Sequence, residues 1–208
     1  MKTILKQFKN IPFTHSNLVS LFLEYNNPND KISQLLKNKE IIKIKKGLYI
    51  LGNDYEQSIS RELIANHIYG PSYISMESAL SYYGLIPEQL YDITSVTTKS
   101  TKEYITERGC FSFIKSPIAL YKIGIVSEQV NNHSFLIASK TKAICDKIIF
   151  TKKINIRSQK ELVIFLEDDL RIDLDELKDL NLREIDECIE VQRKSKQLIL
   201  LKKILETG

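Results

Sequence analysis

The stretch YGPSYISMESALSYYGLIPE, residues 69–88, constrains the fold more than any other part of the chain. Gly70-Pro71 predicts the end of a preceding helix, because glycine tolerates the left-handed conformation and proline cannot continue a helix. Ser75 is expected to cap a new helix with a buried apolar stripe, and Gly84 is expected to end it. The stretch therefore predicts a helix stop, a short extended piece, a capped helix and a second stop.

Composition indicates a globular protein of one or two domains, because 43% of the 208 residues are hydrophobic. The first ten residues contain no apolar run of signal-peptide length, and no segment approaches the roughly 20 apolar residues of a membrane span. We therefore expect a cytoplasmic protein. Cys110, Cys145 and Cys188 are scattered without metal-ligand spacing, and the histidines are scattered as well. These patterns predict reduced thiols, no metal site and no cofactor.

Charge is distributed unevenly along the chain. Residues 1–50 hold nine lysines and three acidic residues, whereas residues 160–190 hold twelve acidic residues and four basic ones. This asymmetry suggests a nucleic-acid-binding face at one end, and either a different partner or a solvated surface at the other.

The basic N-terminal region has the outline of a winged helix-turn-helix. Thr14 can cap a helix that runs to about Leu23, and Pro28 suits the first turn of a second helix. After Glu40 the hydrophobic period changes to two, and Lys46-Gly47 can turn a hairpin. Helix, turn, helix and basic hairpin together predict a winged helix-turn-helix DNA-binding domain over residues 1–53.

In this geometry the second helix would enter the major groove, where amide side chains can bind adenine edges, and the hairpin lysines would contact phosphates. The predicted DNA-binding residues are Asn29, Lys31, Ser33, Gln34, Lys37 and Asn38 on or beside the second helix, and Lys43, Lys45 and Lys46 on the hairpin. A solvated lysine face or a protein-binding winged helix would give the same pattern. Because arginine is absent from residues 1–60, any specific readout should depend on amides and DNA shape.

The remainder, residues 54–208, predicts an α+β domain. Asp54 can cap a helix through Tyr69, and residues 92–137 contain several short β-rich segments, including IALYKIGIV, that favour a mainly antiparallel sheet. Helices are expected from Ser139 to Phe150, after the SQKE capping box at 158–161, around 174–180, and from Asn181 to about Glu206.

No catalytic constellation is evident. Ser75 is interpreted as a helix cap rather than a nucleophile, and Glu77 and Asp146 as isolated structural acids on helices. A metal-dependent nuclease is the main enzymatic alternative, because Asp168, Asp169 and Glu176 precede a lysine at 178. Helical spacing favours a solvated acidic surface for that segment.

The stretch at 69–88 resembles the sequence that marks the AbiEi-type antitoxins, which are transcriptional-regulator-like proteins of type IV toxin–antitoxin systems. Further segments resemble later parts of the same family in the same order: GLYIL at 47–51, ITSVTTKST at 93–101, SFLIASKTKAICDKIIF at 134–150 and FLEDDLRIDLDELKDLNL at 165–182. The resemblance covers nearly the whole chain.

The resemblance implies a DNA-binding N-terminal module that represses its own operon, and a C-terminal domain that counters a nucleotidyltransferase-like toxin. The implied partners are operator DNA and that toxin, with or without a stable complex between them. A stand-alone winged-helix regulator without a toxin is the second hypothesis, and the nuclease is the third.

Overall fold

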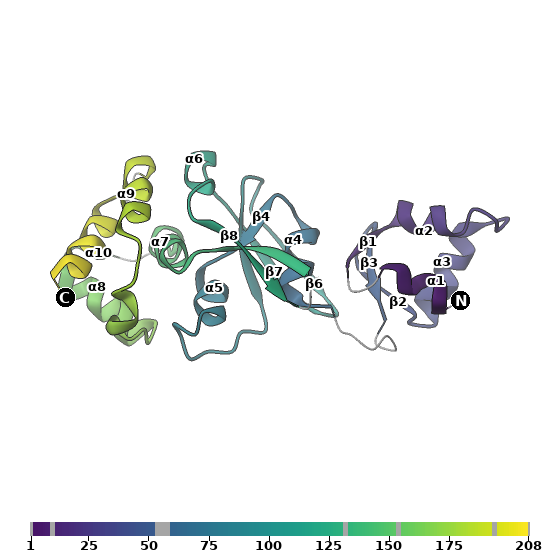
Figure 1. Ribbon diagram of the computed structural model, residues 1–208, viewed down its shortest axis with the longest axis horizontal. Coiled ribbons are helices and arrows are strands. Elements are labelled where there is room, and N and C mark those ends of the chain that lie inside the picture. Colours follow the sequence, from purple (N-terminus) through teal and green to yellow (C-terminus); the bar gives the residue numbers. More distant parts are fainter. Residues whose placement is uncertain are drawn as a thin grey trace.

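The computed structural model describes residues 2–8, 11–52, 59–130, 133–152, 155–192 and 195–207. The protein has an α+β fold with mixed and antiparallel sheets. Figure 1 shows three parts in sequence order along the long axis: an N-terminal module, a central sheet with its helices, and a C-terminal group of helices. The two chain ends therefore lie at opposite ends of the molecule.

The N-terminal module contains short helices and a small antiparallel sheet. Its elements are α1 (Lys2–Leu5), η1 (Lys6–Phe8), β1 (Phe13–Thr14), α2 (His15–Leu21), α3 (Pro28–Lys37), β2 (Ile41–Lys45) and β3 (Leu48–Leu51). The predicted cap at Thr14 is confirmed: its hydroxyl accepts a hydrogen bond from the amide of Asn17, whose side chain in turn accepts from the Thr14 amide. The helix ends at Leu21, slightly earlier than predicted.

The strands of this module pair in the order β1-β3-β2. The predicted hairpin is confirmed, with Gly47 in its turn at φ +80°. At the other end of β3, the Gly52 amide donates to the Glu40 carbonyl at 2.9 Å. This bond joins the end of the hairpin to the segment that leaves α3.

The central sheet has six strands in the described part of the chain, in the order β6-β7-β5-β4-β9-β8. They are β4 (Ser72–Ile74), β5 (Ile93–Thr97), β6 (Lys102–Thr106), β7 (Gly109–Lys115), β8 (Ile125–Val130) and β9 (His133–Ala138). As expected, most pairings in this sheet are antiparallel, namely β4–β5, β6–β7 and β8–β9, but the sheet is mixed because β5 pairs with β7, and β4 with β9, in parallel. The hairpins β6–β7 and β8–β9 each join the antiparallel pair β4–β5 through a parallel contact.

The stretch at 69–88 forms β4 and α5 (Met76–Tyr82). The helix before it, α4 (Arg61–Ile68), begins after Ser60, whose hydroxyl accepts from the Leu63 amide at 3.1 Å. The predicted cap at Asp54 lies outside the described residues. Both predicted helix stops are confirmed, since α4 ends before Gly70 and Gly84 follows α5 at φ +71°.

The predicted strand IALYKIGIV is wrong in its first half. Its first four residues form α6 (Ile118–Tyr121), and β8 begins only at Ile125. Gly124 stands between them at φ +60°, and a Cβ atom there would lie 2.7 Å from the Cβ of Lys142. A left-handed glycine packed against a helix therefore separates the two elements.

The C-terminal part is helical. Its elements are α7 (Lys140–Phe150), α8 (Gln159–Ile164), the π-helical turn η2 (Phe165–Asp169), the short 3₁₀ helix η3 (Leu174–Leu177), α9 (Leu182–Val191) and α10 (Ser195–Thr207). The predicted caps at Ser139, Ser158 and Asn181 are confirmed. The prediction of a single final helix is wrong, because α9 and α10 are separate helices. Gln192, which follows α9, has an extended backbone conformation with φ −115° and ψ 136°.

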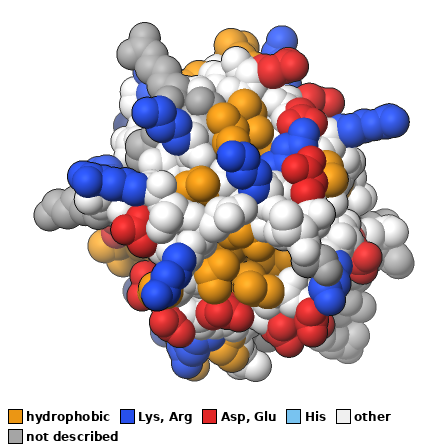
Figure 2. All heavy atoms as spheres, turned by 90° about the vertical axis from the view of Figure 1, so that its left-hand side faces the viewer, with side chains coloured by type: hydrophobic (Ala, Val, Ile, Leu, Met, Phe, Trp, Pro, Cys, Tyr) orange, Lys and Arg blue, Asp and Glu red, His pale blue; other side chains and the backbone are white. Residues whose placement is uncertain are grey.

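Helix α7 occupies the centre of the main hydrophobic core. Figure 1 shows it between the central sheet and α8–α10, and its residues from Thr141 to Ile149 are all buried. Figure 2 shows the outer end of the helical group, where apolar side chains gather among interspersed acidic and basic ones. None of the described helices combines the length and the apolar character that crossing a membrane requires.

Candidate nucleic-acid interface

Helix α3 is positioned by an apolar face that packs inside the N-terminal module. Pro28 occupies its first turn, where a missing amide hydrogen costs nothing. Ile32 and Leu35 are buried in a cluster with Leu18 and Phe22 of the preceding helical segment. This packing determines which face of α3 is left on the surface.

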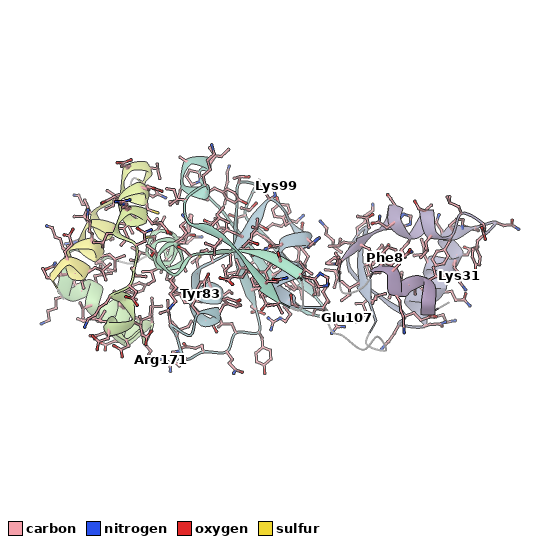
Figure 3. The ribbon with its side chains drawn as sticks, viewed as in Figure 1. Phe8, Lys31, Tyr83, Lys99, Glu107 and Arg171 are labelled. Carbon is pink, nitrogen blue, oxygen red and sulfur yellow. The ribbon has the colours of Figure 1, made fainter. Side chains whose placement is uncertain are left out.

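The opposite face of α3 is exposed and polar. Of the predicted DNA-binding residues in this region, Lys31 is half-buried, and the exposed ones are Asn29, Ser33, Gln34, Lys37 and Asn38. The Lys31 ammonium donates to Gln34 Oε1 at 2.9 Å and lies 5.7 Å from the centre of the Tyr25 ring. Figure 3 shows Lys31 in the N-terminal module, far from the central sheet. The structure therefore brings these residues together on one accessible face.

Two acidic residues lie close to this face. Asp30 is exposed in the first turn of α3, and its carboxylate accepts from the Asn27 amide group at 2.8 Å. Glu40 accepts from the side chain of Asn38 at 3.4 Å. Both carboxylates lower the positive potential that the lysines supply to a polyanion. Asn38 and Gln34 each make a side-chain hydrogen bond in this region, to Glu40 and from Lys31 respectively.

The hairpin lysines do not share one environment. Lys43 and Lys46 are exposed, as a phosphate-contacting hairpin requires. Lys45 instead turns toward the central sheet: its ammonium donates to the Ile68 carbonyl and lies 5.8 Å from the centre of the Tyr104 ring. The three hairpin lysines that were expected to contact phosphates therefore do not share one surface. Lys43 and Lys46 face outward, whereas Lys45 faces the central sheet.

The hairpin also joins the module to the rest of the molecule. Its buried residues Ile42, Ile44, Leu48 and Ile50 belong to the main hydrophobic cluster of the central part, whereas Ile41 and Tyr49 belong to the cluster of the N-terminal helices. In Figure 1 the hairpin accordingly lies between the helices α1–α3 and the central sheet. Helix α3 lies on the far side of the module, and its polar residues Asn29, Ser33, Gln34, Lys37 and Asn38 are exposed.

A second polar cluster lies deep in the central part, and the isolated role expected for Asp146 is wrong. Its carboxylate accepts hydrogen bonds from Tyr73 at 2.9 Å and Ser75 at 2.7 Å, and it pairs with the Lys142 ammonium at 2.8 Å. Lys142 also donates to the Leu120 carbonyl at 3.0 Å. The four clustered side chains are fully buried. Burial raises the pKa of Asp146, and the bonds from Lys142, Ser75 and Tyr73 oppose that rise.

This cluster changes the interpretation of Ser75. The residue occupies the N-cap position of α5, but its hydroxyl makes no hydrogen bond to a backbone amide of that helix. The hydroxyl donates a hydrogen bond to the Asp146 carboxylate instead. The one signal in the sequence was the spacing of Lys142 and Asp146, four residues apart on α7, which places both on one helix face. Glu77 on α5 is likewise not isolated, since its carboxylate pairs with the ammonium group of Lys147 on α7.

The segment considered for a nuclease has no assembled site. Asp168 and Asp169 are exposed on η2, and Lys178 pairs with Asp175 at 2.8 Å on the surface. Among the residues that the structure describes, no group of three or more His, Cys, Asp or Glu side chains could hold a metal ion.

Comparison with known proteins assigns no family and no function to this chain. No protein-family model matches the chain, and no curated protein matches its sequence.

Proposed function

We propose that this protein is a DNA-binding antitoxin of the AbiEi kind, which contacts operator DNA through helix α3 and represses its own operon. The observation that carries the DNA-binding part is the accessible polar face of α3, held outward by a buried apolar face. A helix of ten residues is about 15 Å long and can lie in a major groove about 12 Å wide.

The order of elements supports a winged-helix interpretation of the module. Helices α2 and α3 are joined by a short turn, and the hairpin β2–β3 follows directly and pairs with β1. In the proposed complex, Gln34 contacts a base edge, while Lys37 and the exposed hairpin residues Lys43 and Lys46 contact phosphates. Lys45 has no role in that hairpin contact.

The DNA-binding part is tested by two substitutions on one helix face. We expect Lys37→Ala to weaken binding to all duplexes and to lower the salt slope by about 0.9, because one phosphate contact is lost. We expect Gln34→Ala to reduce the preference for the DNA upstream of the gene over a scrambled duplex, by about 1–3 kcal/mol. Fluorescence anisotropy at several salt concentrations measures both quantities.

Lys160→Ala on α8 serves as the control, because it removes the same charge from an exposed site in the C-terminal helical group. Equal losses in the Lys37 and Lys160 variants would mean that overall charge, and not α3, governs binding. A wild-type protein that binds no duplex at low salt would contradict the proposal.

The antitoxin part rests on the ordered sequence resemblance. We expect this protein, when it is co-expressed with a nucleotidyltransferase-like protein from a neighbouring gene, to restore the growth that the nucleotidyltransferase-like protein alone inhibits. The full-length Lys37→Ala variant is expected to retain the rescue, since the resemblance assigns neutralisation to the C-terminal domain. DNA binding without any rescue would favour the stand-alone regulator, and Mg²⁺-dependent cleavage of the duplex would favour the nuclease.

A further inference from the structure

A row of lysine and tyrosine side chains connects the hairpin of the N-terminal module to the edge of the central sheet. The Nζ atom of Lys45 lies 5.8 Å from the centre of the Tyr104 ring. The Nζ atom of Lys102 lies 4.8 Å from the same ring and 5.8 Å from the Tyr69 ring. Lys99 continues the row, with its Nζ atom 5.3 Å from the Tyr69 ring. We call these five residues the lysine–tyrosine row.

The end of helix α4 anchors the row. Lys45 donates to the carbonyl of Ile68, the last residue of α4, and Lys99 donates to the carbonyl of Gly70. Lysines are favoured at this end of a helix, because the terminal carbonyls carry partial negative charge. Each of these two ammonium groups still has N–H bonds available for another acceptor.

In the part of the chain that the structure describes, the lysines of the row, Lys45, Lys99 and Lys102, have no acidic ion-pair partner. Glu103 precedes Tyr104 on β6, but strand alternation directs it to the other face, where its carboxylate accepts from the Cys110 thiol at 3.2 Å. Three neighbouring ammonium groups create a local positive potential that favours an anion.

We propose that the lysine–tyrosine row binds the phosphate backbone of the DNA, so that the central part of the protein contributes to the interface. This inference rests on the proposed function and extends it beyond residues 1–53. Lys99 and Lys102 are exposed, so their ammonium groups are accessible to phosphates. Because contacts to phosphates carry no sequence information, we expect the contribution of the row to be independent of DNA sequence.

Nucleic acid fits the row better than an acidic protein does, because the row continues the hairpin. Lys45 is one end of the row and lies on β2 with Lys43, while Lys46 follows in the turn. Contacts between β2 and β6 bring the hairpin and the sheet edge together. The row and the exposed hairpin lysines are therefore joined through one short strand, with Lys45 facing the central sheet.

The test uses the full chain with Lys99→Gln and Lys102→Gln combined, which removes two charges and keeps most of each side-chain stem. The probes are a labelled duplex of the DNA upstream of the gene and a scrambled duplex of the same composition. We expect affinity for both duplexes to fall by the same factor, on the order of tenfold at 0.1 M salt, and the salt slope to fall by roughly 1.8. The preference for one duplex over the other should not change.

Lys160→Gln combined with Lys203→Gln is the matched control, because it removes two charges from exposed positions on α8 and α10. Lys99→Arg with Lys102→Arg should retain affinity, which separates loss of charge from loss of folding. An unchanged salt slope in the glutamine variant, alongside weakened binding by Lys37→Ala, would overturn this inference and leave the proposed function intact. Unchanged DNA binding with lost growth rescue would assign the row to a protein partner and would also overturn it.

Discussion

At the scale of single residues, the Asp146–Lys142 pair is a fully buried ion pair with several hydrogen bonds. Both side chains are fully buried, and the carboxylate also accepts from Tyr73 and Ser75 of the stretch at 69–88. A buried charge is costly unless its partners satisfy it. The pair therefore ties β4 and the start of α5 to α7 with a geometry that apolar contacts alone would not specify.

Asp146→Asn should destabilise the protein strongly, because the buried Lys142 ammonium would lose the negative charge that compensates it and would keep only neutral acceptors such as the Leu120 carbonyl. We expect a loss of about 3–5 kcal/mol in the free energy of unfolding, measured by urea denaturation. The double variant Asp146→Asn with Lys142→Met should recover a large part of this loss, since it removes the unpaired charge. A double variant less stable than Asp146→Asn would show that Lys142 stabilises the fold through other contacts.

At the scale of elements, the β2–β3 hairpin depends on two glycines for different reasons. Gly47 has a positive φ, but a Cβ atom there would meet nothing within 4 Å. At Gly52 a Cβ atom would lie 1.9 Å from the Lys39 carbonyl oxygen, where β3 passes the segment that leaves α3. The turn therefore requires a left-handed backbone conformation at position 47. The end of β3 requires glycine at position 52 because a Cβ atom has no room beside the backbone of Lys39.

These two requirements predict unequal effects of substitution. Gly47→Asn should cost less than about 0.5 kcal/mol, because asparagine tolerates the left-handed region. Gly52→Ala should cost about 1–3 kcal/mol, because backbone must move to relieve the overlap. Thermal unfolding of both variants gives the comparison. A Gly47 variant that is the less stable of the two would contradict the assignment of these roles.

At the scale of the whole molecule, the hairpin is shared between two hydrophobic clusters. One group of its apolar side chains packs with the N-terminal helices, and the other packs with the core of the central part. The lysine–tyrosine row adds polar contacts along the same boundary. The N-terminal module is therefore coupled to the central part through more than the connecting chain.

This coupling predicts that the full chain unfolds in one calorimetric transition. Ile50 is fully buried in the cluster of the central part. Ile50→Ala should lower the free energy of unfolding of the whole protein by about 2–5 kcal/mol while keeping the transition single. Two separate transitions, of which only the first shifts in the variant, would show that the module and the central part fold independently.

Local elements were predicted well because their signals act over a few residues. The caps at Thr14, Ser139, Ser158 and Asn181 were assigned from side chains that bond to amides two or three positions away. The exposed face of α3 also followed from helical periodicity, and this made the candidate site partly predictable. Ser75 occupies the predicted N-cap position, but its hydroxyl bonds to Asp146, 71 residues away, instead of to a backbone amide, and no local signal predicts that partner.

The amino-acid sequence determined where most helices and hairpins begin and end, since capping bonds, turn glycines and hydrophobic period are local interactions. It also placed the basic and acidic segments at opposite ends of the chain. Only the tertiary structure decided which strands lie next to one another in the central sheet. It also decided the partners of the buried Lys142–Asp146 pair and the direction of the Lys45 side chain. The physical reason is the same for all three features. The group that hydrogen-bonds to a strand edge, or that completes the hydrogen bonding of a buried charge, lies far away in the sequence, and no local pattern identifies it.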